Sequence, residues 1–238
     1  SFSSKPVKSK KHSSTEYTST FSSPSIMRNV SIWKAFNQDL KYPLVIFHEG
    51  NITEAQQVYI SDKSMGQNLI FKDISSVWTG GYEGMCRFMI YDIWEQCKQY
   101  DYVMRIDEDC IIERVIYDPF SQIENAGLDY FTSVWWAESH TETNQHLPKV
   151  IQDLTGADPK EFYNDRYPYT NVSLAKVSFM RGLKELKLIA ENPLQRKYRF
   201  GDLPAIGALL NIYAKDKVGT LAGLSYYHAS HNASIICE

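Results

Sequence analysis

The chain has 238 residues, of which 43% are hydrophobic and 13% aromatic, so it can bury a sizeable core. Its formal net charge is −3, and no basic stripe runs through the part expected to fold, which argues against a nucleic-acid partner. No run approaches eighteen apolar residues, so the sequence predicts no membrane span.

The cysteines and the glycosylation sequons bear on the cellular compartment. The four cysteines lack the spacing of a zinc site and are too sparse for a disulfide scaffold, although one or two bridges remain open. Four Asn-x-Ser/Thr sequons favour a secretory lumen, at Asn29, Asn51, Asn171 and Asn232. We expect the soluble part of an anchored protein in the Golgi or endoplasmic reticulum lumen, or a cytoplasmic location if the protein is viral or bacterial.

The beginning of the chain differs in composition from the rest. Residues 1–25 are rich in serine and lysine and poor in apolar side chains, which predicts a polar tail or stem. We expect residues 26–238 to form a single domain. Within it, the apolar run at 42–47 predicts a buried strand that ends in His48 and Glu49, where one of these two side chains borders a ligand.

The next two elements lead to an acidic cluster. Apolar side chains repeat every four positions from 85 to 97, which predicts an amphipathic helix opened by nearby glycines. Residues 102–106 then form a second buried strand, which ends directly in Asp107, Glu108 and Asp109.

Further elements continue the alternation of strand and helix. One strand and three helices are predicted, at residues 131–136, 147–154, 180–191 and 205–214. Gly156 is expected to close the first of these helices, and Asp202 to be the N-cap of the last. This alternation predicts an α/β fold with a mixed, mostly parallel sheet flanked by helices, in which ligands bind beyond the carboxyl ends of the strands.

The acidic cluster lies at that position in the fold. Neighbouring carboxylates repel one another, so the cluster favours a cation, and the Asp-x-Asp spacing lets Asp107 and Asp109 converge on one ion. Mn²⁺ or Mg²⁺ prefers such oxygen ligands and retains phosphate oxygens as further ligands. A bound ion of this kind would stabilise a diphosphate leaving group. A solvated acidic turn without an ion is the alternative interpretation.

Sequence blocks in a consistent order extend from about residue 40 to residue 230. They are Tyr-Pro-Leu-Val-Ile-Phe at 42–47, Tyr-Glu-Gly-Met-Cys-Arg-Phe at 82–88, Tyr-Val-Met-Arg-Ile-Asp at 102–107, Tyr-Asp-Pro-Phe at 117–120 and Arg-Phe-Gly-Asp-Leu-Pro at 199–204. This set resembles the fungal Golgi α-1,2-mannosyltransferases of glycosyltransferase family 15. The resemblance implies a Rossmann-like GT-A catalytic domain that uses Mn²⁺ (or Mg²⁺) and transfers mannose from GDP-mannose with retention of configuration. A UDP-sugar donor stays open, and the acceptor would be a glycan or glycoconjugate.

The resemblance also implies roles for individual residues. Asp107 takes the place of the metal-binding acid, with Asp109 beside it, and His228 supplies a nitrogen ligand. Tyr82 lies where the family contacts the acceptor sugar, and Asp202 lies beside that site and binds a sugar hydroxyl.

Three further residues are expected around the substrate. Arg87 reaches the phosphates or braces the fold. Glu108 orients the ribose or a water molecule beside the ion. His48 borders the donor.

One position departs from the family. Ser173 stands where the family has a glutamate that is a candidate nucleophile, and a serine hydroxyl without a nearby base is a poor nucleophile. Either the acceptor attacks from the same face with help from the leaving phosphate, or another carboxylate serves, or the chemistry differs.

Two other function classes therefore remain. The protein is either a catalytically inactive relative that binds a nucleotide sugar or glycan, or a different metal-dependent phosphate-transfer enzyme such as a nucleotidyltransferase. The latter class would be expected to carry a glycine-rich phosphate loop with lysine, which the sequence lacks.

Overall fold

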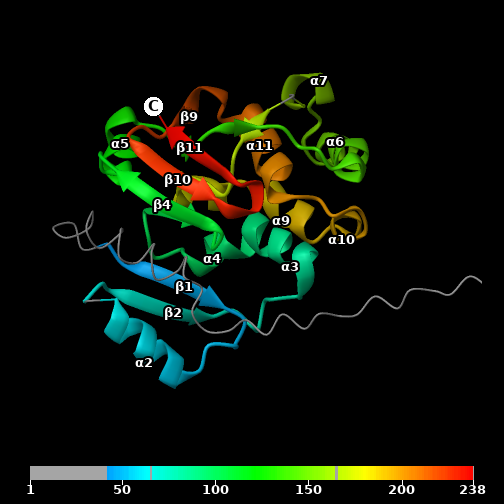
Figure 1. The fold of residues 1–238 in the computed structure, drawn as a ribbon. Coiled ribbons are helices and arrows are strands. Elements are labelled where there is room, and N and C mark those ends of the chain that lie inside the picture. The colour runs from blue at the N-terminus through cyan, green and yellow to red at the C-terminus, as the bar shows by residue number, and fades with distance from the viewer. Residues whose placement is uncertain (1–41, 65, 164–165, 238) are drawn as a thin grey trace, which may run out of the picture.

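The computed structural model describes residues 42–64, 66–163 and 166–237 (Figure 1). The expected tail at 1–25 and the expected start of the domain at residue 26 lie outside these residues. Among the helices of the described part, none is long and apolar enough to cross a membrane.

The first described elements form a β–α–β unit at the lower end of Figure 1. Strand β1 (Leu44–His48) pairs in parallel with β2 (Leu69–Asp73), and helix α2 (Glu54–Lys63) connects them. Helix α2 begins at a capping box, in which Thr53 and Gln56 satisfy each other's backbone N–H groups. The strand expected at 42–47 is confirmed, whereas α2 and β2 were not predicted.

The amphipathic helix expected at 85–97 is confirmed as three consecutive helical segments. They are α3 (Gly81–Arg87), the π-helical segment η1 (Phe88–Asp92) and α4 (Ile93–Gln96). The buried side chains Phe88, Ile90 and Trp94 face the larger hydrophobic core. A π-helical turn inserts an extra residue, and such turns occur frequently at functional sites.

The central sheet has the strand order β3-β8-β5-β9. Its strands are β3 (Tyr102–Ile106), β8 (Val172–Lys176), β5 (Tyr130–Thr132) and β9 (Val218–Thr220). Strand β8 pairs antiparallel with both β3 and β5, and β5 pairs in parallel with β9. The α/β class and the flanking helices are confirmed. The expectation of a mostly parallel arrangement is wrong for the described strands, because β8 returns between β3 and β5.

A second sheet has the order β11-β10-β4 (Figure 1) and packs against the first through a smaller hydrophobic core that both sheets share. Its strands are β4 (Cys110–Val115), β10 (Leu224–His228) and β11 (Ala233–Cys237). The antiparallel register of β10 on β4 sets His228 opposite Cys110. This pairing places the end of β10 directly beside the turn that joins β3 to β4.

The remaining elements correct several predicted boundaries. The expected strand at 131–136 divides into β5 and β6 (Trp135–Trp136), and β6 pairs with β7 (Tyr167–Pro168). The helix expected at 180–191 is two helices, because the backbone leaves helical geometry at Leu183. The other elements are α5 (Pro119–Ala126), α6 (Thr141–Thr155), α7 (Pro159–Phe162), α8 (Val177–Gly182), α9 (Lys184–Ala190), α10 (Pro193–Tyr198), α11 (Asp202–Tyr213), η2 (Lys215–Lys217) and η3 (Ala229–His231).

Two helix ends test the expected caps. Gly156 ends α6 in the left-handed conformation with φ of 76°, as expected for a C-terminal glycine. The N-cap of α11 is Gly201, and Asp202 is the first residue inside the helix, so the predicted N-cap at Asp202 is wrong. The carboxylate of Asp202 is directed instead to a partner on β3, described below.

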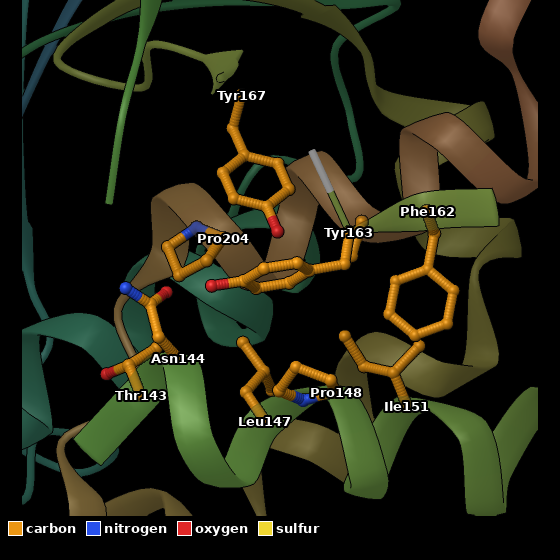
Figure 2. Close-up of a pocket in the computed structure, with 10 residues that line it drawn as sticks. Thr143, Asn144, Leu147, Pro148, Ile151, Phe162, Tyr163, Tyr167 and Pro204 are labelled. Atoms are coloured by element: carbon orange, nitrogen blue, oxygen red, sulfur yellow. The ribbon is translucent and has the colours of Figure 1, made fainter. Parts of the chain in front are cut away.

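Helices α6, α7 and α11 meet around an apolar seam (Figure 2). Leu147, Ile151, Phe162 and Tyr167 line it, and the seam has no room for a water molecule. A Cβ atom on Gly207 of α11 would lie 2.5 Å from the Tyr167 ring, so glycine is what allows this close approach. The seam is therefore a packing contact that fixes α11 against β7.

Candidate functional site

The acidic cluster forms the tight turn between β3 and β4. The backbone N–H of Cys110 donates to the carbonyl of Asp107 at 3.0 Å, and the N–H of Asp107 donates to the carbonyl of Asn171 at 2.9 Å. The turn is thus tied both to itself and to the segment that precedes β8. Its two aspartates, however, bind different partners.

Asp107 is bound by a buried arginine from its own strand. The Arg105 guanidinium donates to both carboxylate oxygens of Asp107, from Nε at 2.6 Å and from Nη2 at 3.0 Å. Its remaining Nη1 donates to Asp202 at the start of α11. The side chains of Arg105 and Asp202 are 8% and 9% exposed, and that of Asp107 is 18% exposed.

The charges in this triad do not balance, because one guanidinium faces two carboxylates. Burial raises the pKa of Asp107 against the opposing effect of Arg105. Burial also acts against the charged form of Arg105, but Asp107 and Asp202 hold its pKa well above the ordinary value. The triad joins β3 to α11, and within it both oxygens of Asp107, one of the three predicted metal ligands, accept hydrogen bonds from Arg105.

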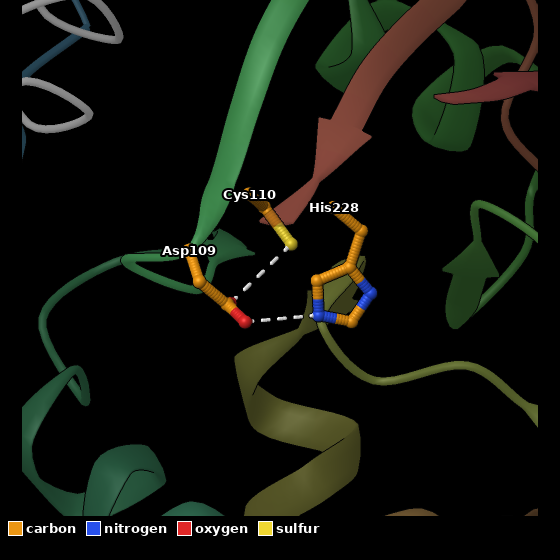
Figure 3. A group of neighbouring side chains, drawn as sticks. All are labelled: Asp109, Cys110 and His228. Carbon is orange, nitrogen blue, oxygen red and sulfur yellow. Dashed lines mark hydrogen bonds and ion pairs between the residues drawn. The ribbon is translucent and has the colours of Figure 1, made fainter. Parts of the chain in front are cut away.

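Asp109 faces the end of β10 instead. Its Oδ2 atom lies 3.1 Å from Nε2 of His228 (Figure 3). The same atom accepts a hydrogen bond from the Ser230 hydroxyl. Although burial acts to raise the pKa of Asp109, the Ser230 hydrogen bond and the nearby His228 hold it below the ordinary value. The carboxylate is therefore ionised at neutral pH, and 31% of the side chain is exposed.

His228 is buried and held in orientation by its neighbours. Its Nδ1 atom lies 2.9 Å from the Tyr169 hydroxyl, and its Nε2 atom lies 3.3 Å from the Asn171 amide nitrogen. Burial lowers the pKa of His228, which favours the neutral ring. A neutral imidazole oriented through one nitrogen presents the other to a cation, as metal-binding histidines do.

The described residues contain one group of three side chains with converging ligand atoms. Asp109, Cys110 and His228 each offer one such atom, and these atoms lie within 4.8 Å of one another. A carboxylate oxygen and an imidazole nitrogen beside a partly exposed turn fit Mn²⁺ or Mg²⁺, with positions left for phosphate oxygens. Cys110 itself is fully buried, and burial raises the pKa of its thiol.

An aromatic group flanks the histidine. Trp136 stacks on Tyr169 with ring centroids 5.3 Å apart, and His231 lies 4.4 Å from His228 between centroids. Trp136 is 38% exposed. The sequence gave no signal that Tyr169 would contact His228, because 59 residues separate them.

Tyr82 lies at the start of α3 and is 49% exposed. The Arg199 guanidinium lies over its ring at 4.6 Å, and Arg199 also approaches Glu83 at 3.6 Å. Burial of the hydroxyl raises the pKa of Tyr82, and the hydrogen bond with Cys86 and the nearby Asp202 act in the same direction. Tyr82 therefore lies near Asp202 of the Arg105 triad.

The other predicted residues have separate surroundings. Arg87 donates to the carbonyl of Val77 at 3.0 Å and pairs with Asp92 at 2.9 Å, which is the bracing alternative of the prediction. Glu108 is exposed on the turn. His48 is buried at the end of β1, where its Nδ1 accepts from the N–H of Gly50 at 3.2 Å.

Ser173 lies in the interior of the central sheet. It is 3% exposed, it is the register partner of Arg105, and its hydroxyl donates to the carbonyl of Thr170 at 3.1 Å. The hydroxyl also contacts the buried Tyr130. No base is among these contacts, so Ser173 has the surroundings of a structural serine.

Comparisons with known proteins identify the fold. No family model and no curated protein matches the chain. Among solved structures, core-mannan synthase A from Aspergillus fumigatus, in its Mn/GDP form, is 16% identical with a TM-score of 0.73, and the match covers 87% of this chain and 71% of that one.

The mannosyltransferase Ktr4p from S. cerevisiae gives a similar result. It is 17% identical with a TM-score of 0.74, and the match covers 87% of this chain and 67% of the yeast chain. A structure of the yeast enzyme in complex with GDP has a TM-score of 0.73. Similarity at this low identity establishes the fold, while the activity has to be argued from the site. The chain thus has the GT-A fold of these fungal mannosyltransferases and is a distant structural relative of them.

Proposed function

We propose that this protein is a metal-dependent glycosyltransferase that transfers a hexose, mannose from GDP-mannose, to a sugar hydroxyl of a glycan or glycoconjugate. The observation that carries the proposal is the contact of Asp109 with His228 at 3.1 Å, which sets a carboxylate and an imidazole side by side at the end of β3. The fold supports it, because one structure with the same fold is in a Mn/GDP form.

Asp109 and His228 would hold Mn²⁺ or Mg²⁺ in this proposal. A bound divalent ion supplies charge stabilisation to the diphosphate leaving group. Asp109 contributes a full negative charge, and Tyr169 keeps the His228 ring in place from its far side. Asp107, held by Arg105, keeps the turn in position, which assigns it a supporting role in place of direct coordination.

The acceptor sugar is proposed to lie near Tyr82 and Asp202. Tyr82 and Arg199 are both exposed and lie against each other, and Asp202 is close enough to Tyr82 to raise its pKa. An aromatic ring covers the apolar face of a sugar while charged groups bind its hydroxyls. In this arrangement α3 and α11 carry the acceptor side, and the β3–β4 turn carries the donor side.

The stereochemical course follows from Ser173. Because its hydroxyl is buried and hydrogen-bonded to a backbone carbonyl, it does not supply the nucleophile of a two-step reaction. Retention would then require attack from the same face, with the leaving phosphate taking the acceptor proton. The same observation favours a second candidate function, in which the protein binds a nucleotide sugar without transferring it.

A luminal location remains part of the proposal. Asn51 and Asn232 are exposed and are therefore accessible as glycosylation sequons, whereas the Asn171 side chain contacts His228. Modification of Asn171 would disturb the candidate site, so among the three sequons within the described residues we expect glycans at Asn51 and Asn232.

Donor turnover distinguishes the two candidate functions. GDP-mannose and a set of UDP-sugars are incubated with the protein, with and without Mn²⁺, and the released nucleoside diphosphate is measured. Mn²⁺-dependent release from GDP-mannose that is lost in Asp109→Ala supports the transferase. Tight GDP-mannose binding without release supports the binding protein, and neither binding nor release would refute both.

A further inference from the structure

The candidate metal site contains a sulfur atom that the proposed function does not use. Cys110 is the first residue of β4, directly after Asp109, and its register partner on β10 is His228. The strand pairing itself therefore fixes the thiol beside the two residues proposed to hold the ion. Figure 3 shows the sulfur pointing toward the Asp109 carboxylate and the His228 ring.

The ligand atoms of the three residues lie near the separations that a single tetrahedral ion requires, although the two measured contacts involve different oxygens of the Asp109 carboxylate. An ion bound at ordinary zinc–ligand lengths separates its nitrogen and oxygen ligands by about 3.3 Å and its sulfur and oxygen ligands by about 3.5 Å. In the structure, His228 Nε2 lies 3.1 Å from Asp109 Oδ2, and the Cys110 sulfur lies 3.9 Å from Asp109 Oδ1. Small side-chain movements bring all three atoms to one ion, since no ligand pair exceeds 4.8 Å.

The surroundings also suit a three-ligand site with an open position. The Tyr169 hydroxyl at Nδ1 can either donate or accept, so it supports the His228 tautomer whose Nε2 is free for a metal. Asp109 is partly exposed, which leaves the fourth position to water or to a phosphate oxygen. One sulfur, one nitrogen and one oxygen from the protein form a donor set typical of Zn²⁺.

We infer that Cys110 is a third protein ligand of this site, which therefore binds the thiophilic ions Zn²⁺ and Cd²⁺ more tightly than Mn²⁺. The thiol gives its proton to solvent when the metal–sulfur bond forms. Mn²⁺ prefers oxygen and nitrogen and gains little from the sulfur, so Zn²⁺ competes with it for Asp109 and His228. The inference rests on the proposed function for the location of the site, and it adds the class of ion that the site selects.

A titration of the metal-free protein with Cd²⁺ tests the sulfur ligand. We expect the ultraviolet charge-transfer absorption of a cadmium–thiolate bond in the wild type, and its loss in Cys110→Ser and Cys110→Ala. Cys237→Ser is the matched control, because Cys237 is also buried and lies at the far end of the same sheet. The absorption should persist in that variant. An absorption that survives in both Cys110 variants, or that is lost in the control, overturns the inference.

X-ray absorption of the zinc-loaded wild type provides a measurement that does not depend on how the variants fold. A sulfur neighbour at about 2.3 Å from zinc is expected, and a first shell of nitrogen and oxygen alone contradicts the inference. In Cys110→Ser, Zn²⁺ affinity should fall by about tenfold or more while Mn²⁺ affinity changes by less than about twofold. Equal losses for both ions would assign Cys110 a structural role only.

The two proposals can fail separately. A zinc–sulfur signal in a protein that releases no GDP from GDP-mannose would refute the transferase and retain the metal site. Mn²⁺-dependent turnover in a protein whose bound zinc has no sulfur neighbour would support the transferase and refute Cys110 as a metal ligand.

Discussion

Asp107 and Asp109 stand two residues apart in one turn, yet they have opposite electrostatic surroundings. Asp107 receives two hydrogen bonds from the buried Arg105, which also binds Asp202 97 residues away. Asp109 receives a hydroxyl hydrogen bond from Ser230 and faces a histidine whose pKa is lowered by burial. The Asp107 carboxylate is therefore paired with a cation of the protein, whereas the Asp109 carboxylate contacts a hydroxyl and a neutral imidazole.

This difference separates a structural acid from one that is available to a ligand. A buried carboxylate that accepts two bonds from a guanidinium cannot turn to a metal without leaving two buried N–H groups of that guanidinium without acceptors, which is costly. A partly exposed carboxylate beside a neutral imidazole loses little when an ion enters between them. The Asp-x-Asp spacing alone makes both residues equivalent, and the neighbouring residues decide their roles.

Loss of Arg105 should give the largest effect. In Arg105→Met, Asp107 and Asp202 are left buried without a cation, so the free energy of unfolding should fall by about 3–5 kcal/mol. Urea denaturation measures it. Arg181→Met is the control, because its pair with Glu95 lies on the surface and its removal should change little. Equal stability of the two variants would contradict the structural role of the triad.

Substitution of the two aspartates should separate their roles. In Asp109→Asn, Mn²⁺-dependent turnover of GDP-mannose should fall by about 100-fold or more, because the ion loses its charged ligand, while the stability is kept. In Asp107→Asn, the stability should fall by about 1–3 kcal/mol, because the amide nitrogen cannot accept a hydrogen bond and one buried Arg105 donor loses its partner. Steady-state rates and urea midpoints, measured on both variants, test this. A reversed pattern would exchange the assigned roles.

The pH dependence of stability tests the surroundings of His228. Its pKa in the folded protein lies below the ordinary 6.5, so the unfolded chain takes up this proton first as the pH falls. The stabilisation is fully present above about pH 6.5 and is lost as the pH falls through the lower folded value. His228→Gln should therefore have a shallower loss of stability between pH 7 and 5 than the wild type. The partly exposed His146→Gln is the control. A wild-type slope in His228→Gln would refute the assignment.

A smaller effect is expected on the acceptor side. Tyr82→Phe removes the hydroxyl that holds the ring against Cys86, a contact worth about 1 kcal/mol or about fivefold, so the ring is less well placed and KM for a mannoside acceptor should rise while donor hydrolysis is unchanged. Tyr59→Phe, on the exposed face of α2, should leave both parameters as they are. If Tyr82→Phe instead lowers donor hydrolysis and leaves acceptor KM unchanged, the acceptor site lies elsewhere.

Local patterns in the sequence predicted much of this fold. The apolar runs at 42–47 and 102–106, the four-residue period over 85–97 and the glycine at 156 each depend on neighbouring residues, and each is confirmed. The antiparallel return of β8 was missed because strand direction is set by the order in which distant segments pair.

Local sequence patterns could not predict which side chains contact one another in the candidate site, because these residues are also far apart in the chain. Asp202 has the sequence signature of a helix cap, but Arg105, far away in the chain, takes its carboxylate. The involvement of Cys110 depends on a register between β4 and β10 that joins residues 118 positions apart. Resemblance to a known family drew attention to Asp107, Asp109 and His228 together. Only the structure shows that Asp107 pairs with Arg105 while Asp109 faces His228.

The position of a bound ion tests the central claim most directly. A crystal of the protein soaked with Mn²⁺ and GDP should give an anomalous difference peak within about 2.0–2.6 Å of Asp109 and His228, with a diphosphate oxygen as a further ligand. The Arg105–Asp107 pair should remain intact beside it. A peak bound by Asp107 with Arg105 displaced, or a site that stays empty while GDP binds elsewhere, would contradict the account.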